Sequence, residues 1–215
     1  MDQSLLNDLN PDQKKAAAHT EGPVLILAGA GSGKTKVLTS RVAYLIQEKS
    51  IDPQNILMVT FTNKAANEMK ERIKKLLTSC QLPFAGTFHA LAVKILRRDG
   101  QHIGVPADFM IYDEQDALDA IKDIMKKLDL STKNLPAGRQ GYNPGAILHT
   151  ISEAKNELIG PTEYPQYARG YFQEAVAQVY LAYQTLLKNN IALDFDDLLS
   201  KTVNLFQKNR EVLGS

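Results

Sequence analysis

Short apolar runs in the first half of the chain are each followed by an amphipathic helical pattern. Residues 24–27, VLIL, predict a buried strand, and residues 56–59, ILMV, predict a second strand before a helix that begins at Asn63. Residues 84–88 predict a third strand, and residues 89–98 predict an amphipathic helix. Because strands and helices alternate along the chain, this part predicts an α/β fold with a parallel sheet.

Beyond Tyr112 the apolar residues recur only at helical spacing. Three amphipathic stretches follow, over residues 113–128, 143–158 and 167–188. We therefore divide the chain into a sheet-forming part over residues 1–111, an all-helical subdomain over residues 112–190, and a return into the first part over residues 191–215. Residues 135–141 contain two glycines and one proline and predict an exposed loop.

The composition of the chain limits the classes of protein to which it can belong. Hydrophobic residues make up 44% of the 215-residue chain, which is enough for a folded core. The 25 Lys and Arg residues nearly cancel the 24 Asp and Glu residues, so binding to a polyanion requires a local basic patch. The only cysteine, Cys80, cannot form an internal disulfide, which is typical of a reducing cytoplasm. Without a signal-like N-terminus or a bilayer-length apolar stretch, the sequence predicts a cytoplasmic protein with no membrane partner.

A glycine-rich segment joins the first predicted strand to its helix. Residues 28–35, AGAGSGKT, follow the P-loop pattern, except that Ala28 replaces the usual first glycine. In such a loop, backbone N–H groups and the helix N-terminus bind phosphates, Lys34 neutralises them, and the Thr35 hydroxyl binds Mg²⁺. The segment predicts a nucleoside triphosphate site in which Lys34 and Thr35 serve catalysis. The residues expected at the nucleotide are Ala28, Gly29, Ala30, Gly31, Ser32, Gly33, Lys34 and Thr35.

Polar and aromatic residues follow the second and third predicted strands. Residues 60–63, TFTN, and 86–89, GTFH, lie at the carboxyl ends of strands, where parallel sheets usually bind ligands. An aromatic ring can stack on a base, and hydroxyl, amide or imidazole groups can contact phosphates. From the residues alone, Phe61 could equally belong to a core, His89 could be structural, and Thr62 could simply cap the next helix.

In this order, the segments resemble the start of the superfamily 1A DNA helicases of the UvrD, PcrA and Rep type. The resemblance rests on residues 9–17, LNPDQKKAA, on the P-loop with its helix, and on the two segments after the strands. It extends over residues 9–213. It implies a P-loop RecA-like parallel sheet with flanking helices, incomplete here, and an inserted all-helical subdomain. The loop at 135–141 looks like an insertion relative to the family.

The resemblance also implies roles for individual residues. Gln13 would read the adenine edge of ATP, since a side-chain amide donates and accepts at once. Arg41 would lie close to the nucleotide, although it could instead be a solvated surface residue. Motifs Ia and Ib of the family would correspond to residues 60–66 and 86–90. The residues implied to contact single-stranded DNA are Thr60, Phe61, Thr62, Asn63, Thr87 and His89, with Phe61 as the stacking side chain.

An acidic segment near the end of the chain predicts a helix start. Residues 194–197, DFDD, run directly into a helical pattern, where the helix dipole favours acids. The family likewise places such a segment before the Asp-Glu pair of its Walker B motif, and that pair is absent from these residues. We therefore expect a chain truncated before that motif and inactive by itself.

The function implied is that of an ATP-dependent 3′-to-5′ DNA helicase, an ATP hydrolase acting on single strands and on single/double-strand junctions. Two alternatives stay open. The chain could be the motor segment of a helicase-nuclease, or it could be a stand-alone nucleotide- or DNA-binding module without motor activity. The sequence does not choose among DNA repair, replication and protein displacement as the biological role.

Overall fold

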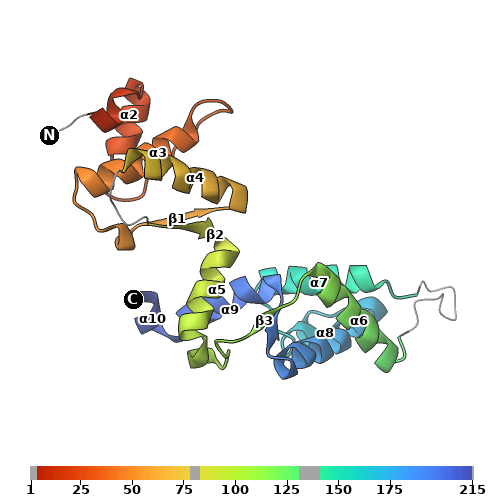
Figure 1. Ribbon diagram of the computed structural model, residues 1–215. Helices are drawn as coiled ribbons and strands as arrows, with labels where there is room; N and C mark the ends of the chain where they lie inside the picture. Colours follow the sequence, from red (N-terminus) through yellow and green to blue (C-terminus); the bar gives the residue numbers. More distant parts are fainter. Residues whose placement is uncertain (1–3, 78–82, 131–140, 215) are drawn as a thin grey trace. The chain divides into compact units, whose positions relative to one another are not determined.

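The computed structural model describes residues 4–77, 83–130 and 141–214. The chain forms two compact units, Met1–Leu91 and Ala92–Ser215. Helices and short parallel strands occur together, which confirms the predicted mixed α/β class (Figure 1). Every helix in the described part is too short or too polar to cross a membrane. Cys80 and residues 135–140 of the predicted loop lie outside the described residues.

Unit 1 contains a two-stranded parallel sheet covered on one face by helices (Figure 1). Leu57 pairs with Phe84 at one end of the sheet, and Thr60 pairs with Thr87 at the other. A core formed by α3 and α4 includes Val42, Ala43, Ile46, Ile73 and Leu77. The elements are α1 (Ser4–Asn7), α2 (Pro11–Ala18), α3 (Lys34–Gln47), η1 (Pro53–Asn55), β1 (Leu57–Thr60), α4 (Asn63–Leu76) and β2 (Phe84–Thr87).

The strands predicted at 56–59 and 84–88 are confirmed as β1 and β2, whereas the strand predicted at 24–27 is wrong. Residues 24–27 are irregular and pair with no strand among the described residues. Ile26 packs beside the small core of Leu9, Ala17 and Val37, but Leu25 and Leu27 are 84% and 85% exposed. A strand exists only through pairing, and an apolar run carries no information about whether a partner is present.

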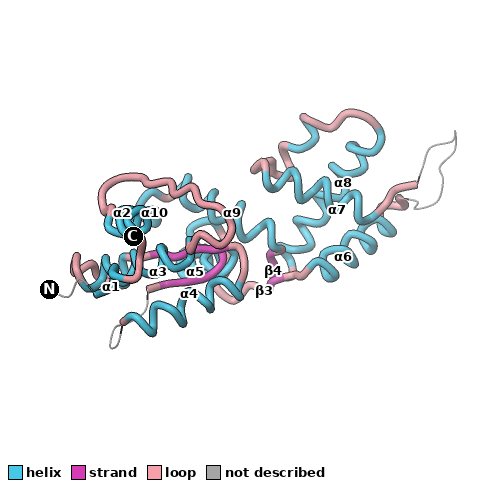
Figure 2. The backbone as a smooth tube through the Cα atoms, turned by 90° about the horizontal axis from the view of Figure 1, so that it is seen from above, coloured by secondary structure: helices cyan, strands magenta, loops and turns pink. Residues whose placement is uncertain are grey.

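Unit 2 is mainly helical. α6, α7 and α8 lie side by side (Figure 2) around a core that includes Ile121, Ile147, Ile151, Val176 and Tyr183. They confirm the three predicted helices, although α8 begins only at Tyr171. The elements from the unit boundary onward are α5 (Phe88–Asp99), η2 (Gly100–Ile103), β3 (Met110–Ile111), α6 (Glu114–Lys127), α7 (Pro144–Asn156), η4 (Tyr164–Gln166), α8 (Tyr171–Asn189), β4 (Ala192–Leu193), α9 (Phe195–Lys208) and α10 (Arg210–Gly214).

Two strands in unit 2 were not predicted. β3 and β4 pair in parallel, with Met110 opposite Ala192 and Ile111 opposite Leu193. Two residues are too few for a periodic pattern, so their pairing could not be read from the sequence. The acidic segment after β4 starts α9, as predicted: Asp194 is the N-cap and accepts a hydrogen bond from the Asp197 N–H at 2.8 Å.

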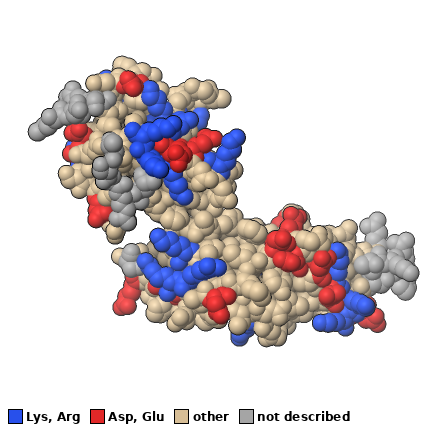
Figure 3. Space-filling view, in the orientation of Figure 1, with Lys and Arg blue, Asp and Glu red and all other residues tan. Residues whose placement is uncertain are grey.

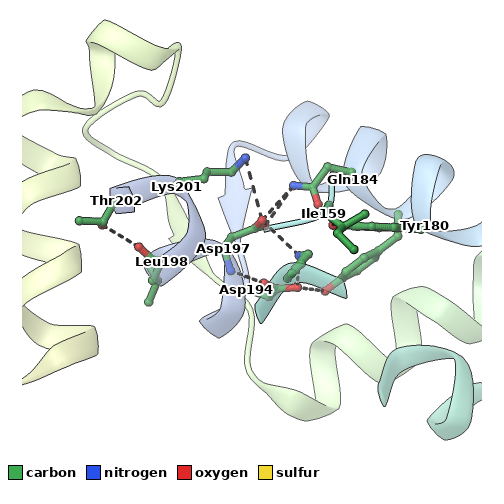
Figure 4. A network of polar contacts seen from close by, with 10 residues as sticks. Ile159, Tyr180, Gln184, Asp194, Asp197, Leu198, Lys201 and Thr202 are labelled. Atoms are coloured by element: carbon green, nitrogen blue, oxygen red, sulfur yellow. Dashed lines mark hydrogen bonds and ion pairs between the residues drawn. The ribbon is translucent and has the colours of Figure 1, made fainter. Parts of the chain in front are cut away.

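A buried polar network holds the start of α9 to the helical core (Figure 4). Lys155 is only 3% exposed, and its Nζ lies 2.6 Å from Asp194 Oδ2 and 3.2 Å from Asp197 Oδ1. The Tyr183 hydroxyl donates to Asp194 Oδ2 at 3.0 Å, and the Gln184 amide donates to both carboxylate oxygens of Asp197. Burial, together with the Asp194 carboxylate, raises the pKa of Tyr183, so its hydroxyl stays a donor. Residues from three helices thus satisfy the two buried carboxylates.

Candidate functional site

The glycine-rich loop of residues 28–35 ends at the N-terminus of α3. Gly31 and Gly33 have φ of +75° and +81°, a left-handed conformation that glycine adopts without steric cost. Gly33 is the N-cap residue of α3 and provides no side chain, so no capping hydrogen bond competes for the first N–H groups of the helix. The sequence thus places the first N–H groups of the helix, which have no partner within it, and the positive end of the helix dipole at one point.

Lys34 folds back across this loop. Its Nζ donates to the carbonyl oxygens of Ala28 at 3.1 Å and Gly29 at 2.7 Å. The Ser32 hydroxyl also donates to the Gly29 carbonyl, at 2.7 Å. Thr35 follows on the first turn of α3 and is half-buried. The ammonium group therefore lies over the loop, where it adds positive charge to that of the helix N-terminus.

Gln13 reaches the same loop from α2. Asn10 caps α2 in a capping box with Gln13, and Pro11 occupies the first turn. The Gln13 side-chain Nε2 donates to the carbonyl oxygen of Ser32 at 3.0 Å. The structure therefore brings this predicted adenine reader into contact with the predicted phosphate loop.

Arg41 makes a different contact from the one implied by the family resemblance. Its guanidinium donates to the carbonyl oxygens of Ala16, at 3.1 Å, and His19 at the C-terminal end of α2. Cations are favoured at that end of a helix by its dipole. Arg41 therefore fastens α2 to α3, and its role at the nucleotide stays a prediction.

The predicted DNA-contacting residues share one edge of the sheet. Thr60 and Thr87 are opposite each other in the last pair of β1 and β2, and Phe61 follows at 90% exposure. The Thr62 hydroxyl accepts from the Ala65 N–H at 3.2 Å and so caps α4, of which Asn63 is the first residue. The Thr87 hydroxyl accepts a similar hydrogen bond from Ala90 at 3.2 Å, and His89 lies on the first turn of α5.

Phe88 belongs to the same edge, although the sequence did not single it out. Its ring centroid is 5.9 Å from that of Phe61, with an interplanar angle of 47°. The signal was available, because each phenylalanine directly follows the last residue of one of two adjacent parallel strands. Aromatic rings at this distance support each other's orientation. The edge therefore presents two rings beside the hydroxyls of Thr60 and Thr87.

The comparisons with known proteins bear directly on these segments. The family model of the UvrD/REP helicase N-terminal domain matches residues 9–215. The chain belongs to this UvrD/REP helicase family. The resemblance on which the site prediction rested is thereby confirmed.

Relatives within the UvrD/REP family cover nearly the whole chain. It is 46% identical over 211 residues to the ATP-dependent DNA helicase PcrA of Staphylococcus aureus (strain Mu50), which covers 98% of this chain. It is 49% identical over 210 residues (97% of this chain) to the protein of the same name from Bacillus subtilis (strain 168). That from Leuconostoc citreum is 47% identical over 214 residues (99% of this chain). In each case the chain spans only 28% of the relative's length.

Charged side chains of both signs are mixed on the face of unit 1 that Figure 3 shows. In α4, basic residues alternate with Glu68 and Glu71. Lys74 and Lys75 lie in its last turn, where the helix dipole favours cations without any ligand. In this UvrD/REP chain, α4 thus carries both signs of charge on its surface.

A cavity of about 480 Å³ lies within unit 2 among α6, α7 and the start of α9. Its lining combines Tyr112 and Phe195 with carboxylates that include Asp196. Burial raises the pKa of Asp196, a hydrogen bond with Ser152 opposes the rise, and the nearby Asp194 carboxylate adds to it. The acids at this cavity stand at the starts of α6 and α9, where the helix dipole offsets part of the cost of their burial.

Proposed function

We propose that this chain binds ATP and Mg²⁺ at residues 28–35 and contacts single-stranded DNA at the ends of β1 and β2, as part of an ATP-dependent 3′-to-5′ DNA helicase. One observation carries the proposal: the Gln13 side chain donates a hydrogen bond to the Ser32 carbonyl oxygen of the loop. The chain in which this contact occurs belongs to the UvrD/REP family. An adenine reader beside a phosphate loop fits ATP better than a nucleotide with another base.

Each part of the nucleotide has a proposed partner. Backbone N–H groups of the loop and the first turn of α3 bind the phosphates, and Lys34 neutralises their charge. A Mg²⁺ ion fits at Thr35, because this hard cation prefers oxygen ligands and the Thr35 hydroxyl stands where the loop meets α3. When bound, Mg²⁺ would neutralise charge on the phosphate oxygens.

The edge formed by β1 and β2 is the proposed DNA site. Phe61 stacks on a base, and its exposure leaves the ring free to do so. Hydroxyl, amide and imidazole groups from both strand ends contact the phosphates and sugars. These contacts carry no sequence information, in keeping with a protein that moves along DNA. The proposed DNA contacts are Thr60, Phe61, Thr62, Asn63, Thr87 and His89.

The proposed architecture is a RecA-like domain interrupted by a helical subdomain. The parallel pairing of β1 with β2 and the position of the phosphate loop before α3 support it. We further propose that these 215 residues alone do not hydrolyse ATP. Phosphoryl transfer also requires a positioned water and a further charge-stabilising arginine, and no residue of the proposed site has either role.

The test is the binding of a fluorescent ATP analogue with Mg²⁺ to the chain and to its Lys34→Ala variant, with GTP as competitor. We expect saturable binding that the substitution weakens at least tenfold and that ATP displaces better than GTP. Circular dichroism would verify that the variant is folded. Equal binding by the folded variant, or equal displacement by GTP, would contradict the proposed site.

A further inference from the structure

Gln13 makes a contact that adenine recognition does not require. Its Nε2 donates to the Ser32 carbonyl oxygen at 3.0 Å, while its Oε1 accepts from the Asn10 N–H, also at 3.0 Å. The backbone N–H of Gln13 donates in turn to Asn10 Oδ1 at 2.9 Å. A carboxamide oxygen has two lone pairs and its nitrogen two hydrogens, so one donor and one acceptor position stay available for a base edge.

The bond to Ser32 acts on a specific peptide group of the phosphate loop. The carbonyl of Ser32 and the N–H of Gly33 belong to one planar trans peptide and point in opposite directions. Because Gln13 holds the carbonyl on its own side, the Gly33 N–H is turned to the other side of the peptide. In a phosphate loop, successive N–H groups of this kind are the donors that bind the anion.

The Gln13 amide packs closely enough against Gly33 to affect the direction of this peptide group. A Cβ atom added at Gly33 would lie 3.1 Å from Gln13 Nε2, so the amide rests against the glycine backbone. Gly33 also has the φ of +81° that lets the loop turn into α3. No side chain caps α3 at this residue, and the Gln13 amide is the side-chain donor that contacts the Ser32 carbonyl among the described residues.

We propose that Gln13 is a positioning residue for the phosphates: by holding the Ser32 carbonyl it directs the Gly33 N–H toward the bound anion. The same side chain then links recognition of the base to the geometry of the loop. This inference rests on the nucleotide site proposed above. It goes beyond that site, because it assigns Gln13 an effect on ligands that contain no base.

The experiment uses inorganic tripolyphosphate with Mg²⁺, titrated calorimetrically into the full chain and its Gln13→Met variant. Methionine keeps the length of the side chain and removes both polar atoms. We expect the variant to bind tripolyphosphate about five- to tenfold more weakly, the effect of one hydrogen bond. Unchanged affinity for tripolyphosphate, with weaker binding of ATP, would mean that Gln13 acts only on the base and would overturn the inference.

A matched control separates the loop contact from helix capping. Asn10→Ala removes the Asn10 side chain from the capping box but leaves the Gln13 amide in place, so we expect a lower melting temperature with tripolyphosphate affinity within twofold of the parent chain. An equal loss of affinity in both variants would assign the effect to the start of α2 and overturn the inference. If the parent chain itself bound no tripolyphosphate, the proposed phosphate site would fail as well.

Nuclear magnetic resonance tests the role of Gln13 in the chain without a ligand. The backbone ¹⁵N–¹H resonance of Gly33 reports the environment of the N–H that Gln13 is proposed to orient. We expect Gln13→Met to move this resonance and Lys15→Met, a change at an exposed neighbouring position of α2, to leave it in place. A Gly33 resonance that is unmoved in a folded Gln13→Met variant would count against the positioning role.

Discussion

Phe61 lies against Phe88, with their ring centroids 5.9 Å apart and their planes inclined by 47°. Phe61 is nevertheless 90% exposed, so its ring contributes little to the folded core. We expect Phe61→Ala to leave the melting temperature nearly unchanged and to weaken binding of single-stranded DNA by about 1–3 kcal/mol, the contribution of one stacked base. Fluorescence anisotropy with a labelled oligothymidine measures the second effect.

Leu38→Ala is the matched control for Phe61→Ala, because Leu38 is also an exposed apolar side chain of unit 1, at 46% exposure. It lies on α3 and is none of the proposed DNA contacts. Its substitution should not change DNA affinity. A similar loss in both variants would indicate nonspecific apolar binding and would rule out a stacking role for Phe61.

Gly33→Ala is expected to disturb the phosphate loop for two reasons, a close contact with Gln13 and an unfavourable backbone conformation. The new methyl group would meet the Gln13 amide at 3.1 Å, and alanine would have to adopt a φ of +81°. The left-handed conformation alone costs about 1–2 kcal/mol in a residue with a Cβ atom, so the melting temperature should fall by several degrees. Gly29→Ala is the control, since its Cβ would meet nothing within 4 Å. A larger loss for Gly29→Ala would contradict this account of the loop.

Lys155→Met should strongly destabilise unit 2. The substitution leaves the carboxylates of Asp194 and Asp197, 6% and 2% exposed, without their buried cation. Removing one partner of a buried ion pair costs about 3–5 kcal/mol, which urea denaturation would measure. Lys122→Met breaks only an exposed ion pair on α6 and should have almost no effect. Comparable unfolding midpoints for the two variants would refute the importance of the buried network.

Asp196→Asn should change how stability depends on pH. Burial and the Asp194 carboxylate raise the pKa of Asp196 in the folded chain, so the folded state binds the proton more tightly than the unfolded state. The charged form therefore costs stability at neutral pH, and this cost disappears as the pH falls through the raised pKa. The variant should be the more stable protein at pH 7, and its advantage over the parent chain should vanish in acid. The stability of both proteins would be measured by circular dichroism over an acid titration. A stability difference between variant and parent chain that does not change with pH would contradict this prediction.

Much of the fold was predictable because local chemistry decides it. The capping residues Thr62 and Asp194 each precede a helix that the sequence predicted, and each accepts a backbone hydrogen bond in the structure. The placement of Thr60 and Thr87 at one edge followed from the rule that parallel strands present their carboxyl ends together, and the structure adds that the two residues pair directly. Strand ends and helix starts are therefore the parts of the candidate site whose positions the sequence predicts.

The features that could not be predicted depend on partners distant in the sequence. The contacts of Arg41 with the end of α2 and of Lys155 with Asp194 join residues that no local pattern connects. An apolar run at 24–27 predicted burial, yet burial depends on what covers the run. The parallel bridge between Met110 and Ala192 is likewise invisible to periodicity, because each strand has only two residues.

Leu25 and Leu27 project from backbone that pairs with no strand in the described part of the chain. Unpaired backbone beside exposed leucines is a template on which another molecule can add a strand. Concentrated samples should therefore self-associate, and the mass measured by light scattering should rise with concentration. A Leu25→Lys, Leu27→Lys double variant should stay monomeric over the same range. Titrations of nucleotide and DNA thus belong at low protein concentration, where the binding signal reports single molecules.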